Sequence, residues 1–388
     1  MSLAFDISNP SRTITGADAS KRLGSLLKEH SLKKILFLTD PGIKSTPIAD
    51  ELQELIRNEG GEILELANLA REPGVENVDE VIEVARRFEP DAVVGVGGGS
   101  VLDVAKLCSV LVRSTKTTLE LLDGEAVPPH TLFTVLIPTT AGTGSEATKN
   151  AIIAIPARHT KGAVVNEKLL PDLVILDPAL TLSLPRGITA TTGMDALCHA
   201  VECYLSRKAN VMNDLLALEA ISLIASSLRK AADNGEDLES RANMLIASYY
   251  AGMCITLSGT NAVHAMSYPL GTTYHIPHGQ ANAMLLPFVM EHNLTALPEK
   301  TTKVAECFGY DPKQEDLDPA AYLTRELHQL VKDLDINTSL LDFGVKREDL
   351  ETLVESAYGN RRLMDNNPME LDRQRIGSIY LQLMGGAQ

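Results

Sequence analysis

The sequence predicts an α/β domain built on a parallel sheet, followed by an all-helical domain. In the first half, short apolar runs alternate with stretches of helical spacing, which is typical of a parallel sheet with helices on both faces. After about Pro185 the pattern is long and helical, and no convincing strand is found. We therefore expect an α/β domain over residues 1–182 and an all-helical domain over residues 183–388.

The strands predicted in the first half are the runs KKILFLTD (33–40), EILELA (62–67), DAVVGVGGGS (91–100), LFTVLIPTT (132–140) and LVILDP (173–178). Between them lie helical stretches in which apolar residues recur at intervals of three and four. In the second half the clearest helical stretches are 191–204, 212–232 and 240–253.

Composition excludes several classes of protein. The chain has 388 residues, of which 44% are hydrophobic and 22% charged, as expected for a globular protein of two or three domains. The net charge of −16 argues against nucleic acids and anionic membranes as partners. No apolar stretch approaches the roughly 18 residues of a membrane span. The five cysteines contain no C-x-x-C pair, and the N-terminus lacks a signal-peptide pattern, so we expect a cytoplasmic enzyme.

Two glycine-rich loops follow predicted strands. The first, Gly97-Gly98-Gly99-Ser100, leads into a helix whose first backbone N–H groups favour an anion such as pyrophosphate. The second, residues 138–145, adds Thr139, Thr140 and Thr143. Either loop alone is equally well explained as an ordinary strand-to-helix turn. Together they predict a dinucleotide site at the carboxyl ends of the strands.

Asp40 ends an earlier predicted strand. From there its carboxylate can accept hydrogen bonds from ribose hydroxyls and repel a 2′-phosphate, so NAD is expected in preference to NADP. The alternative is a turn residue before Pro41-Gly42.

The helical half carries a candidate metal centre. Asp195 and His199 are four residues apart and share one helix face. A second segment supplies His264, His275 and His278. One carboxylate and three imidazoles form a site for Fe²⁺ or Zn²⁺, which would act as a Lewis acid on an alcohol or carbonyl oxygen. For the first pair alone, an exposed helical ion pair is the stronger alternative.

Two residues of the same helix are open to more than one reading. Glu202 lies on the face of His199 and either supports a metal ligand from behind or is an ordinary surface charge. Cys198 is expected to be a core residue and not a ligand.

Four motifs together resemble the iron-dependent (group III) alcohol dehydrogenase family over nearly the whole chain. They are GGGSVLDVAK (97–106), PTTAGTGSEAT (138–148), GMDALCHAVECY (193–204) and VHAMSYPLGTTYHIPHGQANAMLLP (263–287). The resemblance implies a dinucleotide-binding α/β domain and an all-helical metal-binding domain. It also implies that Asp195, His199, His264 and His278 bind Fe²⁺. By the Irving–Williams order, Zn²⁺ could replace Fe²⁺ by misloading.

The same resemblance implies cofactor contacts. Gly97, Gly98, Gly99 and Ser100 would hold the pyrophosphate, with Thr139, Thr140, Thr143 and Lys161 near the cofactor and Asp40 at the ribose. Asp103 and Lys106 match the remaining positions of the first motif.

The chain departs from the family at several positions. Where many members have a proton-relay histidine it has Tyr268, so Tyr268, His275 or a water chain would move the proton. It has Glu72-Pro73 where many relatives have Asn-Pro, and Ile255 at a position that is aromatic in some.

A pair of arginines bears on the substrate. Arg361 and Arg362 lie near a segment that often approaches the substrate in this family. An arginine there could pair with a carboxylate of the substrate. A solvated charge pair explains them equally well.

We therefore expect an NAD(P)-dependent, Fe²⁺-containing alcohol dehydrogenase or aldehyde reductase. Its substrate would be a small alcohol or aldehyde, acidic if an arginine binds it, and the enzyme would be a homodimer or larger homo-oligomer. The alternatives are a Zn²⁺ polyol dehydrogenase, a dehydroquinate-synthase-like lyase, a metal-dependent hydrolase and a non-catalytic binding protein.

Overall fold

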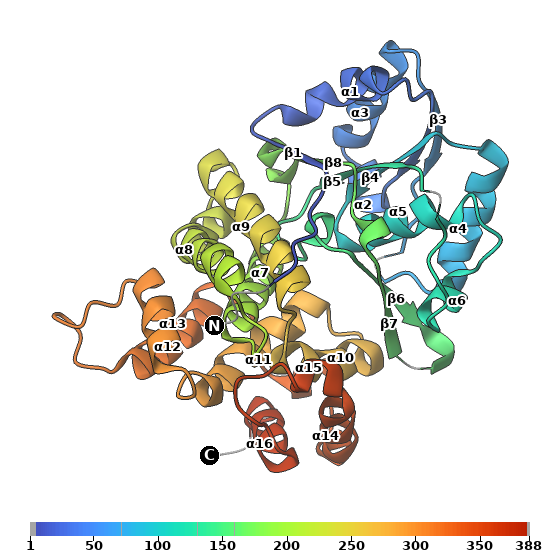
Figure 1. Ribbon diagram of the computed structural model, residues 1–388. Helices are drawn as coiled ribbons and strands as arrows, with labels where there is room; N and C mark the ends of the chain where they lie inside the picture. The colour runs from blue at the N-terminus through green and yellow to red at the C-terminus, as the bar shows by residue number, and fades with distance from the viewer. Residues whose placement is uncertain (1–4, 71, 130, 159, 386–388) are drawn as a thin grey trace. The chain divides into compact units, whose positions relative to one another are not determined.

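The computed structural model describes residues 5–70, 72–129, 131–158 and 160–385. It divides into two compact units, each described here by itself (Figure 1). The sheet unit comprises Ser8–Thr140 and Gly144–Ser183. The helical unit comprises the chain from Leu184 onward, with Ala141–Thr143 and the N-terminal segment up to Ile7. The predicted fold class, a parallel-sheet domain followed by a helical one, is confirmed.

The sheet unit is built on six parallel strands in the order β1-β8-β5-β4-β2-β3. Their bounds are Arg12–Thr15 (β1), Lys34–Leu38 (β2), Glu62–Leu66 (β3), Ala92–Gly97 (β4), Phe133–Pro138 (β5) and Leu173–Leu176 (β8). The strand order reverses between β2 and β4, because β3 lies outside β2 while β5 and β8 lie on the other side of β4. Ligands of open parallel sheets bind at such a reversal, beyond the carboxyl ends of the strands.

Alternation along the strands divides the core into two layers. In β2, Ile35 and Phe37 pack into one apolar layer with the helices α1 (Leu23–Glu29) and α3 (Pro47–Asn58). Leu36 and Leu38 pack into the other layer with α4 (Val75–Phe88) and α5 (Gly99–Leu111). Successive side chains of a strand point to opposite faces, so a sheet covered on both faces needs apolar residues at every position. This explains why the central strands read as continuous apolar runs.

Helices connect these strands. Their bounds are Leu23–Glu29 (α1), Pro41–Lys44 (α2), Pro47–Asn58 (α3), Val75–Phe88 (α4), Gly99–Leu111 (α5) and Thr118–Leu122 (α6). Short 3-10 turns lie at Ala19–Arg22, Ser145–Ala147, Pro156–Arg158, Glu167–Leu169 and Pro178–Thr181.

The sequence analysis misses three strands. β1 has only four residues, mostly exposed at the edge of the sheet, so it shows no apolar run. β6 (Asn150–Ile155) and β7 (Thr160–Val165) form a separate antiparallel pair. Only alternate residues of β6 are buried, which is typical of a two-stranded ribbon and gives a weaker signal than the central strands.

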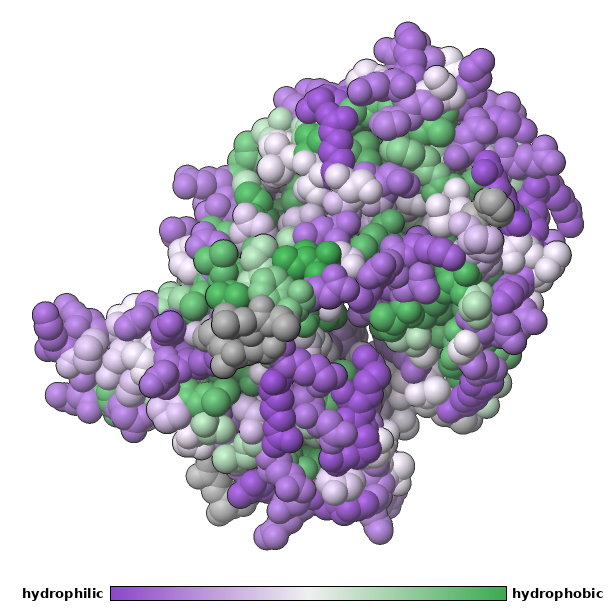
Figure 2. All heavy atoms as spheres, in the orientation of Figure 1, coloured by the Kyte–Doolittle hydropathy of each residue, from purple (hydrophilic) through white to green (hydrophobic). Residues whose placement is uncertain are grey.

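The helical unit contains no strand among its described residues. Its helices are Arg186–Leu205 (α7), Val211–Asp233 (α8), Leu238–Leu257 (α9), Ala262–Tyr274 (α10), His278–Asn293 (α11), Pro298–Cys307 (α12), Pro319–Asp333 (α13), Leu350–Gly359 (α14), Arg361–Met364 (α15) and Arg373–Leu383 (α16). Short 3-10 turns lie at Leu340–Phe343 and Arg347–Asp349. In the view of Figure 2 the surface over α14 and α16 is mostly hydrophilic, and the exposed Arg373–Glu355 ion pair joins these two helices.

α7, α8 and α9 pack together into the core of the helical unit. Gly193 of α7 permits this packing, because a Cβ there would lie 2.2 Å from the side chain of Leu228 on α8. By length and composition alone α8 could cross a membrane, but core helices of globular proteins pass the same test.

Candidate metal centre

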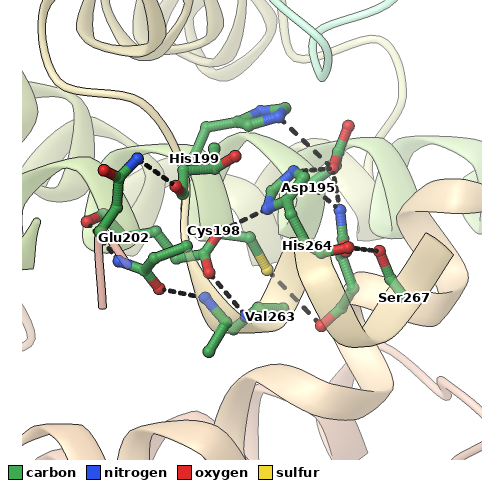
Figure 3. Close-up of polar contacts among 12 residues, drawn as sticks. Asp195, Cys198, His199, Glu202, Val263, His264 and Ser267 are labelled. Atoms are coloured by element: carbon green, nitrogen blue, oxygen red, sulfur yellow. Dashed lines mark hydrogen bonds and ion pairs between the residues drawn. The ribbon is translucent and has the colours of Figure 1, made fainter. Parts of the chain in front are cut away.

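Three helices of the helical unit bring the predicted metal ligands together. α7 presents Asp195 and His199 on one face, and α10 carries His264 in its first turn (Figure 3). α11 begins at His278. Asp195, His199 and His264 are buried, and the side chain of His278 is 29% exposed. His278 is thus the most accessible residue of this cluster, which we call the metal centre.

The ligand atoms converge. Asp195 Oδ1 lies 3.9 Å from Nε2 of His199, 3.9 Å from Nε2 of His264 and 3.6 Å from Nε2 of His278. One ligand atom from each of the four residues lies within 4.8 Å of all the others. Four ligands around a tetrahedral ion, with bonds near 2.1 Å, would be about 3.4 Å apart. Small side-chain movements would therefore bring this set to coordination distance.

Glu202 holds His264 from behind. It lies two turns along α7 from Asp195 and is fully buried. Its Oε1 accepts a 2.7 Å hydrogen bond from the backbone N of Val263, and its Oε2 contacts Nδ1 of His264 (Figure 3). This carboxylate–histidine arrangement leaves Nε2 of His264 facing the other ligands, as is usual in metal sites. The geometry agrees with the prediction that Glu202 supports a metal ligand, His264, and not with the alternative that it is a surface charge.

A backbone carbonyl orients His199. Its Nδ1 lies 3.3 Å from the carbonyl oxygen of Gly142, so its Nε2 is the atom turned toward Asp195. Gly142 reaches this position because it has no side chain: a Cβ there would lie 2.7 Å from Cβ of Thr192. Gly279 is constrained in the same way, since a Cβ would lie 2.5 Å from the carbonyl oxygen of Thr191. This close approach fixes the start of α11, and hence His278, against α7.

Asn282, which the sequence analysis missed, lies at the centre of the cluster. It is fully buried on α11, one turn after His278. Its Nδ2 donates a 2.7 Å hydrogen bond to Asp195 Oδ1 and lies 3.1 Å from Nε2 of His264 and 3.2 Å from Nε2 of His278. The i, i+4 spacing from His278 is the only sequence signal that could have found it.

Burial and mutual charge set the protonation of the centre. Burial lowers the pKa of His264 to about 4 and also lowers that of His199, so both imidazoles are neutral at pH 7 and offer lone pairs. Burial would raise the pKa of Asp195, but the three histidines and Asn282 outweigh it, and the carboxylate is ionised. Burial raises the pKa of Glu202 to about 8, and a cation bound through Nε2 of His264 would require the proton between the two side chains to lie on Nδ1.

The remaining candidates of the helical half lie around this cluster. Cys198 is buried and its Sγ contacts the carbonyl of Asn282, while burial raises its thiol pKa, as expected for a core residue. The ring of Tyr268 lies 6.0 Å from that of His278. His275 is exposed and ends α10 in a left-handed conformation, outside the cluster.

In the sheet unit, the predicted cofactor residues meet at the point where the strand order reverses. Asp40 follows β2, Gly97 ends β4 and leads through Gly98 into Gly99 and Ser100 of α5, and Thr139 follows β5, so these residues lie at the ends of three neighbouring parallel strands. Gly97 and Gly98 are closely approached: a Cβ at Gly97 would lie 3.1 Å from Asp40 Oδ2, and one at Gly98 would lie 3.4 Å from Oγ1 of Thr140.

Asp40 also fills the alternative role considered for it. Its Oδ1 accepts hydrogen bonds from the backbone N of Gly42 at 2.8 Å and of Ile43 at 3.1 Å, capping α2. Oδ2 takes no part in that cap. The turn role and a ribose-binding role are therefore compatible, one oxygen for each.

A buried polar network fastens the second glycine-rich loop to α5. Lys106 Nζ donates to Asp103 at 3.0 Å and to Thr148 at 3.1 Å, and Ser145 donates to Asp103 at 2.5 Å. Asp103 and Lys106 of α5 thus hold the second glycine-rich loop in place through Ser145 and Thr148.

Lys161 lies apart from this network, on β7. Its Nζ forms a 2.8 Å ion pair with Glu72, one of the residues at which the chain departs from its expected family. Thr143 belongs to the helical unit, whereas the other predicted cofactor residues belong to the sheet unit.

Comparison with known proteins agrees with this arrangement. The model of the iron-containing alcohol dehydrogenase family matches residues 10–178, and that of the C-terminal region of the Fe-containing alcohol dehydrogenase family matches residues 189–384. A long-chain-alcohol dehydrogenase from Geobacillus thermodenitrificans is 37% identical over 97% of this chain and 96% of its own length.

Solved structures give the same result. A 1,3-propanediol oxidoreductase superposes with a TM-score of 0.92 at 34% identity, over 98% of this chain and all of its own. A sulfoacetaldehyde reductase from Bifidobacterium kashiwanohense, solved in complex with NAD⁺, superposes with a TM-score of 0.91 at 26% identity over the full length of both chains.

Proposed function

The chain belongs to the iron-containing alcohol dehydrogenase family, and from this premise we propose that it transfers a hydride between NAD and a small alcohol or aldehyde at an Fe²⁺-loaded metal centre. The observation that carries the proposal is the convergence of one carboxylate oxygen and three imidazole nitrogens within 4.8 Å. Zn²⁺ suits the same donors and would replace Fe²⁺ by misloading.

The residues present fit a divalent cation. The donor set is one ionised carboxylate and three imidazoles, and His199 and His264 are each held through Nδ1 so that Nε2 faces inward. When bound, the ion would act as a Lewis acid on the substrate oxygen, stabilising an alcohol's conjugate base or polarising a carbonyl.

The chain's own residues would supply orientation and proton transfer. Glu202 and the Gly142 carbonyl fix the tautomers of two ligands, and Asn282 fixes the Asp195 carboxylate. We assign the proton relay to Tyr268, which is half-buried beside His278, in preference to the exposed His275.

We infer NAD as the cofactor in preference to NADP. The relative from Bifidobacterium kashiwanohense was solved with NAD⁺. In this chain a carboxylate, Asp40, follows β2 next to the glycine-rich end of β4, where it would repel a 2′-phosphate. The N-terminus of α5, which begins at Gly99 and Ser100 after Gly97 and Gly98, would receive the pyrophosphate. Lys161 would contact the cofactor only if Glu72 releases it.

We also propose a cytoplasmic location and a homodimer or larger homo-oligomer. All five cysteines are free, as expected in a reducing compartment. The relatives act on long-chain alcohols, 1,3-propanediol or sulfoacetaldehyde, so family membership leaves the substrate open and residues of this chain must choose it.

The test is anaerobic loading with Fe²⁺ followed by NADH oxidation with a panel of aldehydes. His199→Ala should lose bound iron and turnover while its circular dichroism spectrum stays that of the wild type. His328→Ala, which removes a histidine paired with Glu291 outside the centre, is the matched control and should keep both. Full iron occupancy in the His199 variant would reject the ligand assignment.

A further inference from the structure

The segment that carries Arg361 and Arg362 is held firmly beside α10. Buried Asn366 and Asn367 follow the short helix α15. Asn366 donates to the carbonyl of Thr260 at 3.1 Å, and Asn367 exchanges 2.8 Å hydrogen bonds with Asn293. These hydrogen bonds hold the backbone of the segment that includes α15 in place.

The two arginines have different surroundings. Arg361 forms an ion pair with Asp365, one turn further on, and its guanidinium lies 5.0 Å from the ring centre of Tyr358. Arg362 forms no ion pair with any described residue. The charge of Arg361 is therefore balanced by Asp365, whereas no carboxylate of a described residue balances the charge of Arg362.

Arg362 faces the metal centre. α15 packs against α10, the helix that carries Tyr268, and the Arg362 side chain interacts with the Tyr268 hydroxyl. The ring centre of Tyr268 lies 6.0 Å from that of His278. The charge of Arg362 also reaches His264. Arg362 is exposed, so its N–H groups are accessible to a small molecule.

Nearby carboxylates do not satisfy this charge. Asp195 is surrounded by the three imidazoles and Asn282, and both oxygens of Glu202 are occupied by Val263 and His264. A guanidinium beside a cation-binding centre raises the energy of the site unless an anion lies between them. The chain has a net charge of −16, so a general excess of basic residues does not explain why Arg362 lacks an ion pair.

We propose that Arg362 recognises an anionic group, a carboxylate or sulfonate, at the far end of a short aldehyde or alcohol substrate. Its planar fork binds both oxygens of such a group, while the substrate's reacting oxygen turns toward the metal centre. Arg362 is thus the residue that selects anionic over neutral substrates. This inference rests on the proposed alcohol dehydrogenase activity and goes beyond it by naming the substrate class.

The experiment compares anionic aldehydes with neutral ones of equal length. Iron-loaded enzyme is assayed for NADH oxidation with glyoxylate, 3-oxopropanoate and 4-oxobutanoate, and with propanal, butanal and pentanal. Wild type should favour an anionic member of the series at least tenfold in kcat/KM. Arg362→Gln should lose about 10- to 100-fold on that substrate, mostly in KM, the range for one hydrogen bond to a charged group. It should change less than threefold on the neutral aldehydes.

Two controls separate charge recognition from other effects. Arg361→Gln, which removes the neighbouring and already paired arginine, should leave both classes of substrate unchanged. Arg362→Lys should recover part of the anionic preference, because it restores the charge without the planar fork. Equal losses on anionic and neutral aldehydes in Arg362→Gln would overturn the proposal, since they would mean that Arg362 acts only through Tyr268.

A binding measurement gives a readout independent of turnover. Calorimetric titration of the iron-loaded protein with 4-hydroxybutanoate should show about 10- to 100-fold weaker binding by Arg362→Gln. Unchanged binding would overturn the proposal. Turnover of neutral aldehydes without any anionic preference would refute the substrate class alone, whereas no turnover of any aldehyde would refute the proposed function on which it rests.

Discussion

Replacement of Glu202 by glutamine tests whether the metal centre depends on the tautomer of His264. The backbone N–H of Val263 is a fixed donor and bonds to one side-chain oxygen of residue 202 at 2.7 Å. Glutamine can offer it only its carbonyl oxygen, so its NH₂ group must face Nδ1 of His264. Nδ1 would then have to accept, and the proton would move to Nε2, the atom that faces Asp195.

The expected loss follows from that exchange. A ligand atom that carries a proton has no lone pair for a cation, and changes to such supporting partners cost about 10- to 100-fold in metal affinity. At 1.4 kcal/mol per tenfold, this is about 1.4–2.8 kcal/mol. We expect the upper end, because Glu202 and His264 are both fully shielded from water that could replace the contact.

Metal affinity is measured by competition with a chromophoric chelator for Fe²⁺ and Zn²⁺, alongside the Tm of the chelated protein. Glu291→Gln is the matched control: it alters a second glutamate–histidine pair, with His328, which is partly exposed and lies outside the metal centre. It should bind metal as the wild type does. If Glu202→Gln also bound metal within threefold of the wild type while remaining folded, the tautomer argument would be wrong.

Three further predictions follow from the structure. Asp40→Gly should reduce the preference for NADH over NADPH by at least tenfold in kcat/KM, because it removes the negative charge that repels a 2′-phosphate. Unchanged kcat/KM values for both coenzymes would show that Asp40 does not lie at the ribose site. Asn282→Leu should lower the Tm of the metal-free, chelator-treated protein, because the charged Asp195 carboxylate loses a hydrogen bond. Such a bond contributes about 1.5–3 kcal/mol to stability. A Tm within 1 °C of wild type, measured by calorimetry, would contradict this. Burial raises the pKa of Glu146 to about 7 from 4.5. The folded state therefore binds its proton more tightly, and this contribution of about 3 kcal/mol is present below pH 4.5 and lost as the pH rises through 7. Glu146→Gln should consequently gain Tm relative to wild type between pH 5 and pH 8, whereas the exposed Glu80→Gln should not; parallel Tm curves would refute the assignment.

The sequence by itself predicted the fold class, which the structure confirms, and the four candidate metal-binding residues, which the structure brings together. Central strands buried on both faces must be apolar at every position, and this local pattern is visible without coordinates. The spacing of Asp195 and His199 is equally local, because four residues complete about one turn of a helix. The weak edge strand β1 and the β6–β7 ribbon escaped prediction because partly exposed strands need no continuous apolar run.

The tertiary structure alone shows which groups contact the candidate metal-binding residues. Gly142, Glu202 and Asn282 reach the metal centre from three separate segments, and each contact depends on how two backbones approach one another. The tertiary structure also distinguishes Arg361 from Arg362, which are adjacent in the sequence and are the same type of residue. Arg361 pairs with Asp365, which lies only four residues further on, whereas the surroundings of Arg362 come from α10, which is distant in the chain and packs against α15.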